Sequence, residues 1–107
     1  MYIVNITFVI EPHKEESLRK YLIDELMPVL FNPESPAKSP ELRKVVEIGG
    51  EKPDPEHGLS IALSASFDSL EVAHKWDKEI LLPALGDFHL KFGPHGLYFE
   101  TILEKIQ

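Results

Sequence analysis

Two neighbouring side chains, His74 and Asp77, have the chemistry of a proton-transfer pair. They are three residues apart in a segment with helical apolar spacing, so they can meet on one side of a helix. A carboxylate beside a histidine orients the imidazole and raises its basicity. Asp77 falls in the middle of the apolar stripe, flanked by Ala73 and Ile80. We predict a catalytic pair; the alternative is a structural pair, or an Asp77 that turns toward a strand end or a partner chain.

Four further side chains are predicted to contact a ligand: Asn5, Trp76, Tyr98 and Glu100. Trp76 lies about 100° around the helix from the centre of the stripe, where an indole ring can form a pocket wall or pack under a loop. Asn5, Tyr98 and Glu100 can line a cavity between the two sheets of a dimer, with Glu100 as its strong acid. The alternative for these three is an ordinary polar interface.

No residue pattern predicts a metal site. His57 lies near Asp54 and Glu56, but two prolines interrupt this segment, and no paired histidine motif such as HExxH is present. We therefore interpret residues 51–58 as a solvated acidic loop. The absence of cysteine also removes thiolate ligands, thiolate nucleophiles and disulfides.

The composition is that of one globular domain over residues 1–107. The hydrophobic content of 43% is enough for a core without disulfide or metal support. The formal charge of −7 disfavours nucleic acid and anionic lipid as partners. No stretch approaches the roughly 20 apolar residues that cross a bilayer, and the first ten residues alternate like a strand and unlike a signal peptide. We expect a cytoplasmic protein with no membrane or nucleic-acid partner.

The chain contains one unit twice. Residues 16–30 return in altered form as residues 71–85, 55 positions later. Each half, about 1–50 and 56–107, therefore has the pattern strand, helix, strand. The correspondence continues at apolar positions on both sides: Val4 with Leu59, Ile6 with Ile61, Phe8 with Leu63, Leu42 with Leu97 and Ile48 with Leu103.

Apolar periodicity and turn residues predict four strands and two helices. The first helix is expected over residues 13–31, and the second from a capping box of Asp68 and Glu71 to about Leu85. The order βαββαβ is that of a ferredoxin-like α+β fold, with a four-stranded antiparallel sheet and both helices on one face. The predicted strands cover residues 2–10, 41–49, 59–67 and 97–104, and residues 32–40 form an irregular connection.

The predicted sheet leaves one face without a helix. This face is too apolar for permanent exposure and too polar for a core, so we predict a homodimer in which two such faces pack together as a dimeric α/β barrel. Alternation places these side chains on it: Ile3, Asn5, Thr7, Val9, Ser60, Ala62, Ser64, Ser66, Tyr98, Glu100 and Ile102.

The duplicated βαβ pattern over residues 2–104 resembles the dimeric α/β-barrel superfamily. That superfamily includes antibiotic-biosynthesis-type monooxygenases, haem-degrading enzymes, muconolactone-type isomerases and ligand-binding domains of regulators. The whole chain is also similar to a family of short bacterial proteins carried as a domain of unknown function. The resemblance implies the fold, a homodimer and a pocket that often lies between helix and sheet.

The haem degraders of this superfamily use an Asn on the first strand, a Trp on or near the second helix, and a His after that Trp. Asn5 and Trp76 are similar to the first two of these residues. His74 precedes Trp76, and His89 lies far beyond it. The resemblance therefore does not extend to haem, and we expect no cofactor.

A strong scaffold without a strong motif favours binding over catalysis. We predict a homodimer that binds a small molecule or a protein partner. The alternative is a cofactor-independent enzyme of monooxygenase or isomerase type, in which His74 and Asp77 transfer protons and Trp76 or Tyr98 holds an aromatic substrate. A third possibility is an interaction module that presents an edge strand or residues 32–40 to another protein.

Overall fold

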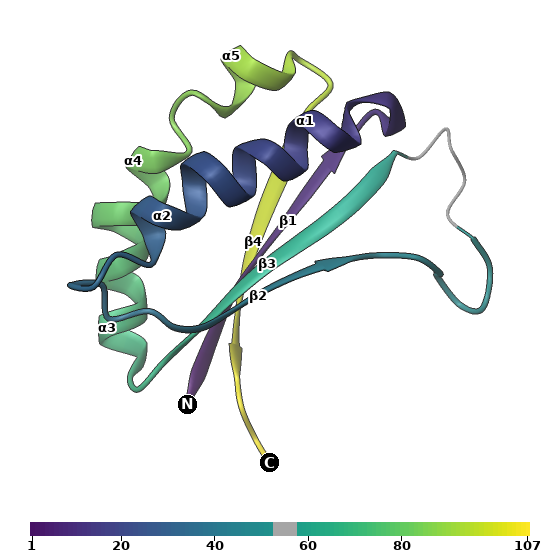
Figure 1. Ribbon diagram of the computed structural model, residues 1–107. Helices are drawn as coiled ribbons and strands as arrows, with labels where there is room; N and C mark the ends of the chain where they lie inside the picture. Colours follow the sequence, from purple (N-terminus) through teal and green to yellow (C-terminus); the bar gives the residue numbers. More distant parts are fainter. Residues whose placement is uncertain (53–57) are drawn as a thin grey trace.

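A computed structural model describes residues 1–52 and 58–107 and contains a four-stranded antiparallel sheet in the order β2-β3-β1-β4 (Figure 1). The strands are β1 (Tyr2–Ile10), β2 (Lys38–Lys44), β3 (Leu59–Phe67) and β4 (Leu97–Glu104). After a 3-10 turn η1 (Pro12–Lys14), helix 1 consists of α1 (Glu15–Lys20), the π-helical segment η2 (Tyr21–Leu26) and α2 (Met27–Leu30). Helix 2 consists of α3 (Leu70–Trp76), the π-helical segment η4 (Asp77–Leu81) and α4 (Leu82–Ala84), and is followed by α5 (Phe88–Phe92).

The core lies between the sheet and the two helices. Every second residue of β1, from Val4 to Ile10, is buried against the helices, whereas the residues between them are only partly covered. This alternation follows from the two-residue period of a strand. Both helices lie on the same side of the sheet (Figure 1), and no helix in the described ranges covers the other side. The predicted order of elements and the one-sided placement of the helices are confirmed.

The sequence duplication has a structural counterpart in the two helices. Each helix contains a π-helical segment shortly before a proline, Pro28 in helix 1 and Pro83 in helix 2. A proline lacks an N–H for the carbonyl four residues earlier and crowds it, and the wider π turn relieves that crowding. Four pairs of side chains at the 55-residue spacing are buried in both copies: Leu18 with Ala73, Tyr21 with Trp76, Leu26 with Leu81, and Leu30 with Leu85.

The predicted bounds of the second strand are wrong. β2 begins at Lys38 and ends at Lys44, because its ladder with β3 runs from the Lys38–Ser66 pair to the Lys44–Ile61 pair, with a bulge between Lys38 and Glu41. Residues 48–51 form a turn instead, in which two glycines adopt positive φ angles of 61° and 85°. Glycine adopts such angles without steric cost, so the Gly-Gly pair forms this turn, which begins beyond the end of β2.

Two local features of the second half also differ from the prediction. The N-cap of helix 2 is Ser69 and not Asp68, because Ser69 Oγ accepts a hydrogen bond from the Val72 N–H at 3.1 Å. The helix α5 was not predicted, although Phe88 and Phe92 have the i, i+4 spacing of a helical apolar face and are both buried.

The predicted facing of the last strand is wrong. Tyr98, Glu100 and Ile102 lie opposite Phe8, Ile6 and Val4 of β1 and so face the helices. The side chains on the open face are Leu97, Phe99, Thr101 and Leu103. For the same reason, the sequence correspondence between Leu42 and Leu97, downstream of the two helices, is not a correspondence in the structure. Leu42 pairs with the buried Leu63, whereas Leu97 lies opposite Val9 on the open face.

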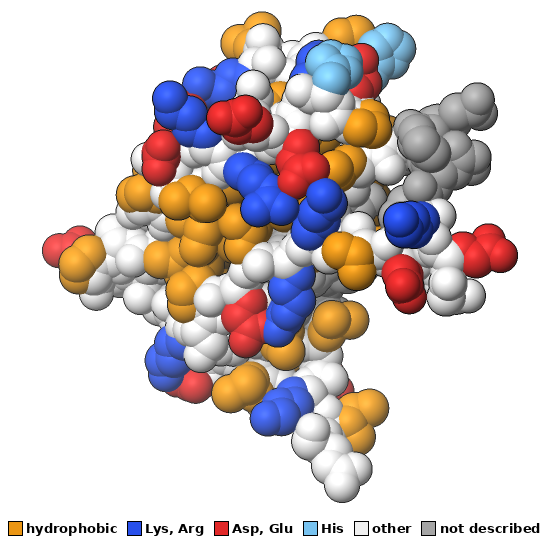
Figure 2. Space-filling model, turned by 45° about the vertical axis from the view of Figure 1, so that its right-hand side comes forward, with side chains coloured by type: hydrophobic (Ala, Val, Ile, Leu, Met, Phe, Trp, Pro, Cys, Tyr) orange, Lys and Arg blue, Asp and Glu red, His pale blue; other side chains and the backbone are white. Residues whose placement is uncertain are grey.

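The surface where helix 1 meets β2 is partly apolar. Ile23 and Leu42 line a small hollow there together with Arg19, Arg43 and Lys44. Figure 2 shows hydrophobic side chains gathered on this side of the molecule next to basic and acidic ones.

Within the described ranges, no helix has the length and apolar character needed to cross a membrane.

Candidate functional site

Two carboxyl groups, those of Asp77 and Glu100, meet where helix 2 lies against β4. Asp77 begins the π-helical segment η4, and Glu100 lies in the middle of β4 opposite Ile6. Asp77 Oδ1 and Glu100 Oε2 are buried, and neither has a hydrogen-bond donor from a nitrogen or hydroxyl group in the described ranges. The side chains are within hydrogen-bonding reach of each other. We call these two residues the carboxyl pair.

The carboxyl pair needs a proton to be stable. Two ionised carboxylates carry only acceptors, so a hydrogen bond between them requires that one is protonated. Burial, and to a smaller extent the hydrogen bond to Asp77 and the negative charge of Asp77, together raise the pKa of Glu100 from 4.5 to about 8. Near neutral pH, Glu100 therefore carries a proton that it donates to Asp77.

The repeat makes the acid on helix 2 unusual. The residue at the equivalent position of helix 1 is Leu22, whose side chain is fully buried. An acid at such a position costs stability unless it is paired or neutralised. Polar groups that are buried without a full set of partners are a feature of functional sites.

An aromatic cluster lies beside Glu100 along β4. Tyr98, two residues before Glu100 on the same face, stacks on His89 with ring centroids 5.8 Å apart and meets the edge of Phe88 at 5.3 Å. Phe88 and His89 belong to α5, the helix that was not predicted. Tyr98 is therefore placed on the same side of the sheet as the carboxyl pair, as a half-buried ring. We call Asp77, Glu100 and Tyr98 the helix–strand site.

His74 is not joined to Asp77. Its side chain is exposed, and no hydrogen bond or ion pair links it to Asp77 in the part of the chain that the structure describes. Glu100 is instead the partner of Asp77. Sequence spacing showed that His74 and Asp77 share a side of the helix, but the partner of Asp77 comes from a strand 23 positions later.

Trp76 belongs to the core. Only 2% of it is exposed, and its Nε1–H donates to the Leu30 carbonyl at 3.3 Å and to Ser35 Oγ at 3.1 Å. Its ring packs against Phe67 with centroids 4.9 Å apart. The indole therefore ties helix 2 to the end of helix 1, which is the loop-packing alternative considered for it.

Asn5 lies on the open face, away from the other predicted site residues. Its Nδ2 donates to Thr7 Oγ1 at 3.3 Å. It borders an open-face hollow of about 500 Å³, whose polar wall includes Glu41, Arg43 and Ser64. The sheet separates Asn5 from Trp76, because Asn5 alternates with the buried Val4 and Ile6 that face the helices. An Asn–Trp arrangement of the haem-degrader type is therefore not assembled here.

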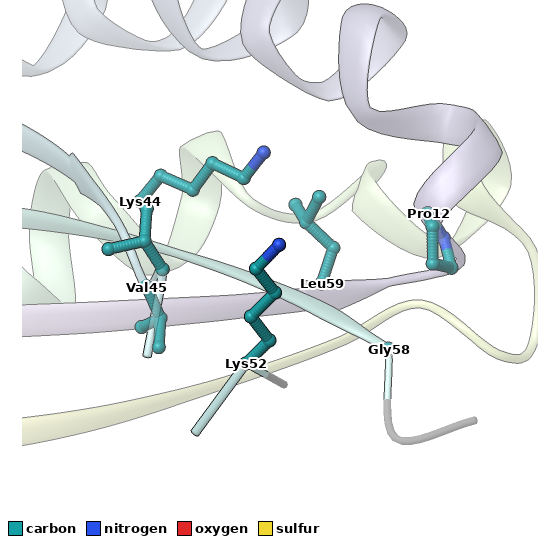
Figure 3. A pocket seen from close by; sticks show the side chains of 7 residues that line it. Pro12, Lys44, Val45, Lys52, Gly58 and Leu59 are labelled. Carbon is teal, nitrogen blue, oxygen red and sulfur yellow. The ribbon is translucent and has the colours of Figure 1, made fainter. Parts of the chain in front are cut away.

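A second hollow, of about 310 Å³, lies where the end of β2 approaches the start of β3 (Figure 3). Lys44 and Lys52 line it together with Pro12, Val45 and Leu59. Lys44 Nζ is paired with Glu15 Oε1 at 2.9 Å, so one of its two ammonium groups is already neutralised by helix 1. None of the predicted site residues borders this hollow.

The described ranges hold no cluster of three or more His, Cys, Asp or Glu side chains suited to a metal ion. The segment of His57, Asp54 and Glu56, predicted as a solvated acidic loop, lies outside the described residues.

Comparisons with solved structures show the fold of the chain. An ethyl tert-butyl ether D (EthD) family protein from Bacillus halodurans has a TM-score of 0.70 and 14% identity, with 99% of this chain and 100% of that chain covered. A proposed antibiotic biosynthesis monooxygenase from Deinococcus radiodurans has a TM-score of 0.67 and 13% identity, covering 100% and 94%. A DABB family protein with a ferredoxin-like fold from Mesorhizobium loti has a TM-score of 0.54 and 12% identity, covering 100% of both.

These structural neighbours confirm the predicted ferredoxin-like fold and belong to the families of the dimeric α/β-barrel type. No protein-family model matches the sequence, and the search of curated proteins gives no match. At identities of 12 to 14%, the likeness extends to the fold and not to the chemistry of the site.

Proposed function

We propose that this protein is a cytoplasmic homodimer that binds a small molecule at the helix–strand site. The observation that carries the proposal is the carboxyl pair, in which two buried oxygens lack partners outside the pair in the described ranges and Asp77 stands at the position of Leu22 in the other repeat. Outside the pair, no donor in the described ranges reaches these two oxygens, and the single proton of Glu100 serves one contact within the pair. The complementary ligand therefore presents a further donor, such as an amine or a hydroxyl. The half-buried ring of Tyr98 offers an apolar surface for the rest of the ligand.

The open face of the sheet supports the homodimer. Leu97, Phe99 and Leu103 lie along β4 on this face, with Thr101 between the last two, and are 54%, 56% and 50% exposed. An exposed apolar row of this kind on a sheet is typical of a protein interface. A second copy offers the same row, and two such faces bury each other in a symmetric dimer. The proposed cytoplasmic location is supported by a composition without cysteine, which is compatible with a reducing compartment.

A thermal-shift screen tests the ligand site. Small amines and alcohols with an aromatic or aliphatic body are screened at about pH 6.5 against the wild type, Asp77→Asn, Glu100→Gln and Glu104→Gln. Glu104→Gln is the matched control, because Glu104 is an exposed acid on the same strand. Compounds that stabilise the wild type and Glu104→Gln but not the two site variants support the proposal. Equal stabilisation of all four proteins contradicts it.

The protonation of Glu100 favours a second candidate, an enzyme that transfers a proton at this site. A carboxyl group whose pKa is raised to about 8 exchanges protons efficiently near neutral pH. One structural neighbour is named as a proposed monooxygenase, which makes oxidation or isomerisation of an aromatic compound the reaction to assay. Glu100→Gln should then lower kcat by roughly 10²-fold or more, whereas His74→Ala should leave it unchanged. Equal activity of wild type and Glu100→Gln excludes this candidate.

A further inference from the structure

The carboxyl pair is the polar link between helix 2 and β4. In the described ranges, no other side-chain hydrogen bond and no ion pair joins the two elements. Among the described residues, the other side-chain hydrogen bonds that join helix 2 to another element are those of Trp76 Nε1–H, which donates to the Leu30 carbonyl and to Ser35 Oγ. The attachment of helix 2 to β4 therefore depends on apolar packing and on these two carboxyls.

The packing over β4 is thinner than over the neighbouring strand. Glu100 and its neighbours Tyr98 and Ile102 are half-buried, whereas Ile6, which lies opposite Glu100, is 1% exposed. β4 is also an edge strand, with β1 as its neighbour on one side. Elements with few buried contacts open at a lower free-energy cost than the core. A change in one polar contact has its largest structural effect at such a place.

We propose that the carboxyl pair is a proton-dependent latch, which holds helix 2 against β4 while one carboxyl is protonated and loosens when both are ionised. With one proton, Glu100 donates a hydrogen bond to Asp77. Without it, two negative charges face each other at a partly buried contact, and the favoured response is to separate and take up water. The latch concerns the regulation of the proposed ligand site, but it acts whether or not a ligand is bound.

Among the described groups around the carboxyl pair, none neutralises its negative charge, so a bound proton does. On β1, the residue opposite Glu100 is the apolar Ile6. On β4, the nearest titratable group is Tyr98, and on α5 it is His89, which stacks on that tyrosine. On helix 2, His74 is exposed, and no cation in the described ranges forms an ion pair with either carboxyl. The raised pKa of Glu100, about 8, is consistent with this arrangement.

The direction of the pH dependence follows from proton linkage. The loosened state has a carboxyl with an ordinary pKa, whereas the closed state binds its proton up to about pH 8. Raising the pH between these values removes protons from the loosened state first and so favours it. The latch should loosen progressively from about pH 5 to about pH 8 and change little above that.

Amide hydrogen exchange on the whole chain without ligand tests the latch. After correction for intrinsic rates, the amides of β4 and η4 should exchange about 70-fold faster at pH 7.5 than at pH 5.5 in the wild type, because one proton is released over these two pH units. Amides in the middle of β3 serve as the internal reference and should change much less. In Glu100→Gln, which donates a hydrogen bond to Asp77 at every pH, this acceleration should be absent.

The fluorescence of Trp76 provides a second readout, because it is the only tryptophan and directly precedes Asp77.

His74→Ala is the control for the titration of that nearby histidine and should keep the full pH response of β4. Asp77→Asn is a second variant that removes the charge pair, so that the test does not depend on the folding of one mutant. The latch is excluded if β4 exchange is independent of pH in the wild type, or if its pH response persists in both carboxyl variants. Both outcomes are measured without a ligand, so the test of the latch is independent of the thermal-shift screen that tests the ligand site.

Discussion

Asp77 occupies in helix 2 the position that Leu22 occupies in helix 1, and the acid is only half-buried where the leucine is fully buried. Both residues lie in a π-helical segment that precedes a proline. The two copies of the unit therefore share a backbone and differ in the chemistry of one central side chain. That difference creates the carboxyl pair, because the strand residue facing Asp77 is Glu100.

Apolar replacement of the carboxyl pair and insertion of an acid at Leu22 should have opposite effects on stability. The double variant Asp77→Leu/Glu100→Leu should raise the free energy of unfolding by about 1 kcal/mol at neutral pH, since apolar replacement of both members of a buried polar pair is often stabilising. Asp77→Leu alone leaves the buried Glu100 carboxyl without its acceptor and should lower that free energy. Leu22→Asp places an unpaired acid in the core and should cost about 3 kcal/mol or more. Urea denaturation measures all three. A loss of stability in the double variant would show that the carboxyl pair contributes more to stability than an apolar contact does.

The stability of the protein should fall as the pH rises through the weakly acidic and neutral range. The pKa of Glu100 is raised in the folded state, from 4.5 to about 8, so between these values the folded state binds a proton that the unfolded state has lost. The contribution is fully present below about pH 4.5, declines up to about pH 8, and is constant above. Unfolding curves at a series of pH values for the wild type and Glu100→Gln measure it. The difference between the two proteins should follow this profile, and a difference that does not vary with pH contradicts it.

Trp76 should act as a packing residue. Trp76→Phe keeps an aromatic ring but removes the Nε1–H that donates to the Leu30 carbonyl and to Ser35 Oγ, which should cost about 1 to 3 kcal/mol. Ser35→Ala leaves the indole its Leu30 acceptor and its packing, and loses the hydrogen bonds that Ser35 Oγ accepts from Trp76 and from the Ala37 N–H, so it should cost less. Chemical denaturation at one pH ranks the two variants. If the Trp76→Phe protein is as stable as the wild type but binds a ligand differently, the indole is a ligand contact and not a packing residue.

The proposed dimer should depend on the apolar row of β4. Phe99→Glu places a charge in the centre of the open face and should give a monomer in light-scattering measurements at micromolar concentration. Leu90→Glu is the matched control, because Leu90 lies on α5 and is 88% exposed. It should leave the assembly unchanged. A wild-type protein that is monomeric, or a Phe99→Glu protein that stays dimeric, contradicts an interface at this face.

Gly58 should tolerate a side chain less well than Gly49. A Cβ at Gly58 would lie 3.0 Å from both the Ile10 carbonyl and Val9 Cγ1, and the backbone there has a φ of +84°. Gly49 has a φ of +61° but nothing within 4 Å of a Cβ. Gly49→Ala should cost about 1 to 2 kcal/mol from the left-handed backbone alone, and Gly58→Ala should cost more. Thermal unfolding compares the stability of the two variants. Equal costs would show that the end of β1 shifts to make room for the added Cβ.

The duplication and the alternation of apolar residues were sufficient to predict the order of elements and the side of the sheet that the helices cover. Both signals are local, since a strand has a period of two and a helix a period of 3.6 residues. They also placed Asp77 in the middle of the helical stripe. The end of β2 and the N-cap of helix 2 escaped prediction, because hydrogen bonds to β3 and to Val72 decide them.

The partner of Asp77 was a matter of tertiary structure. Both faces of β4 carry large apolar residues, Leu97 and Phe99 on one and Tyr98 and Ile102 on the other, so the sequence determined that the strand has two faces but not which one is buried. The register with β1, in which Ile6 lies opposite Glu100, decides this. Hydrogen bonds between strands far apart in the sequence thus bring the second carboxyl beneath helix 2, and local spacing alone pointed instead to the exposed His74.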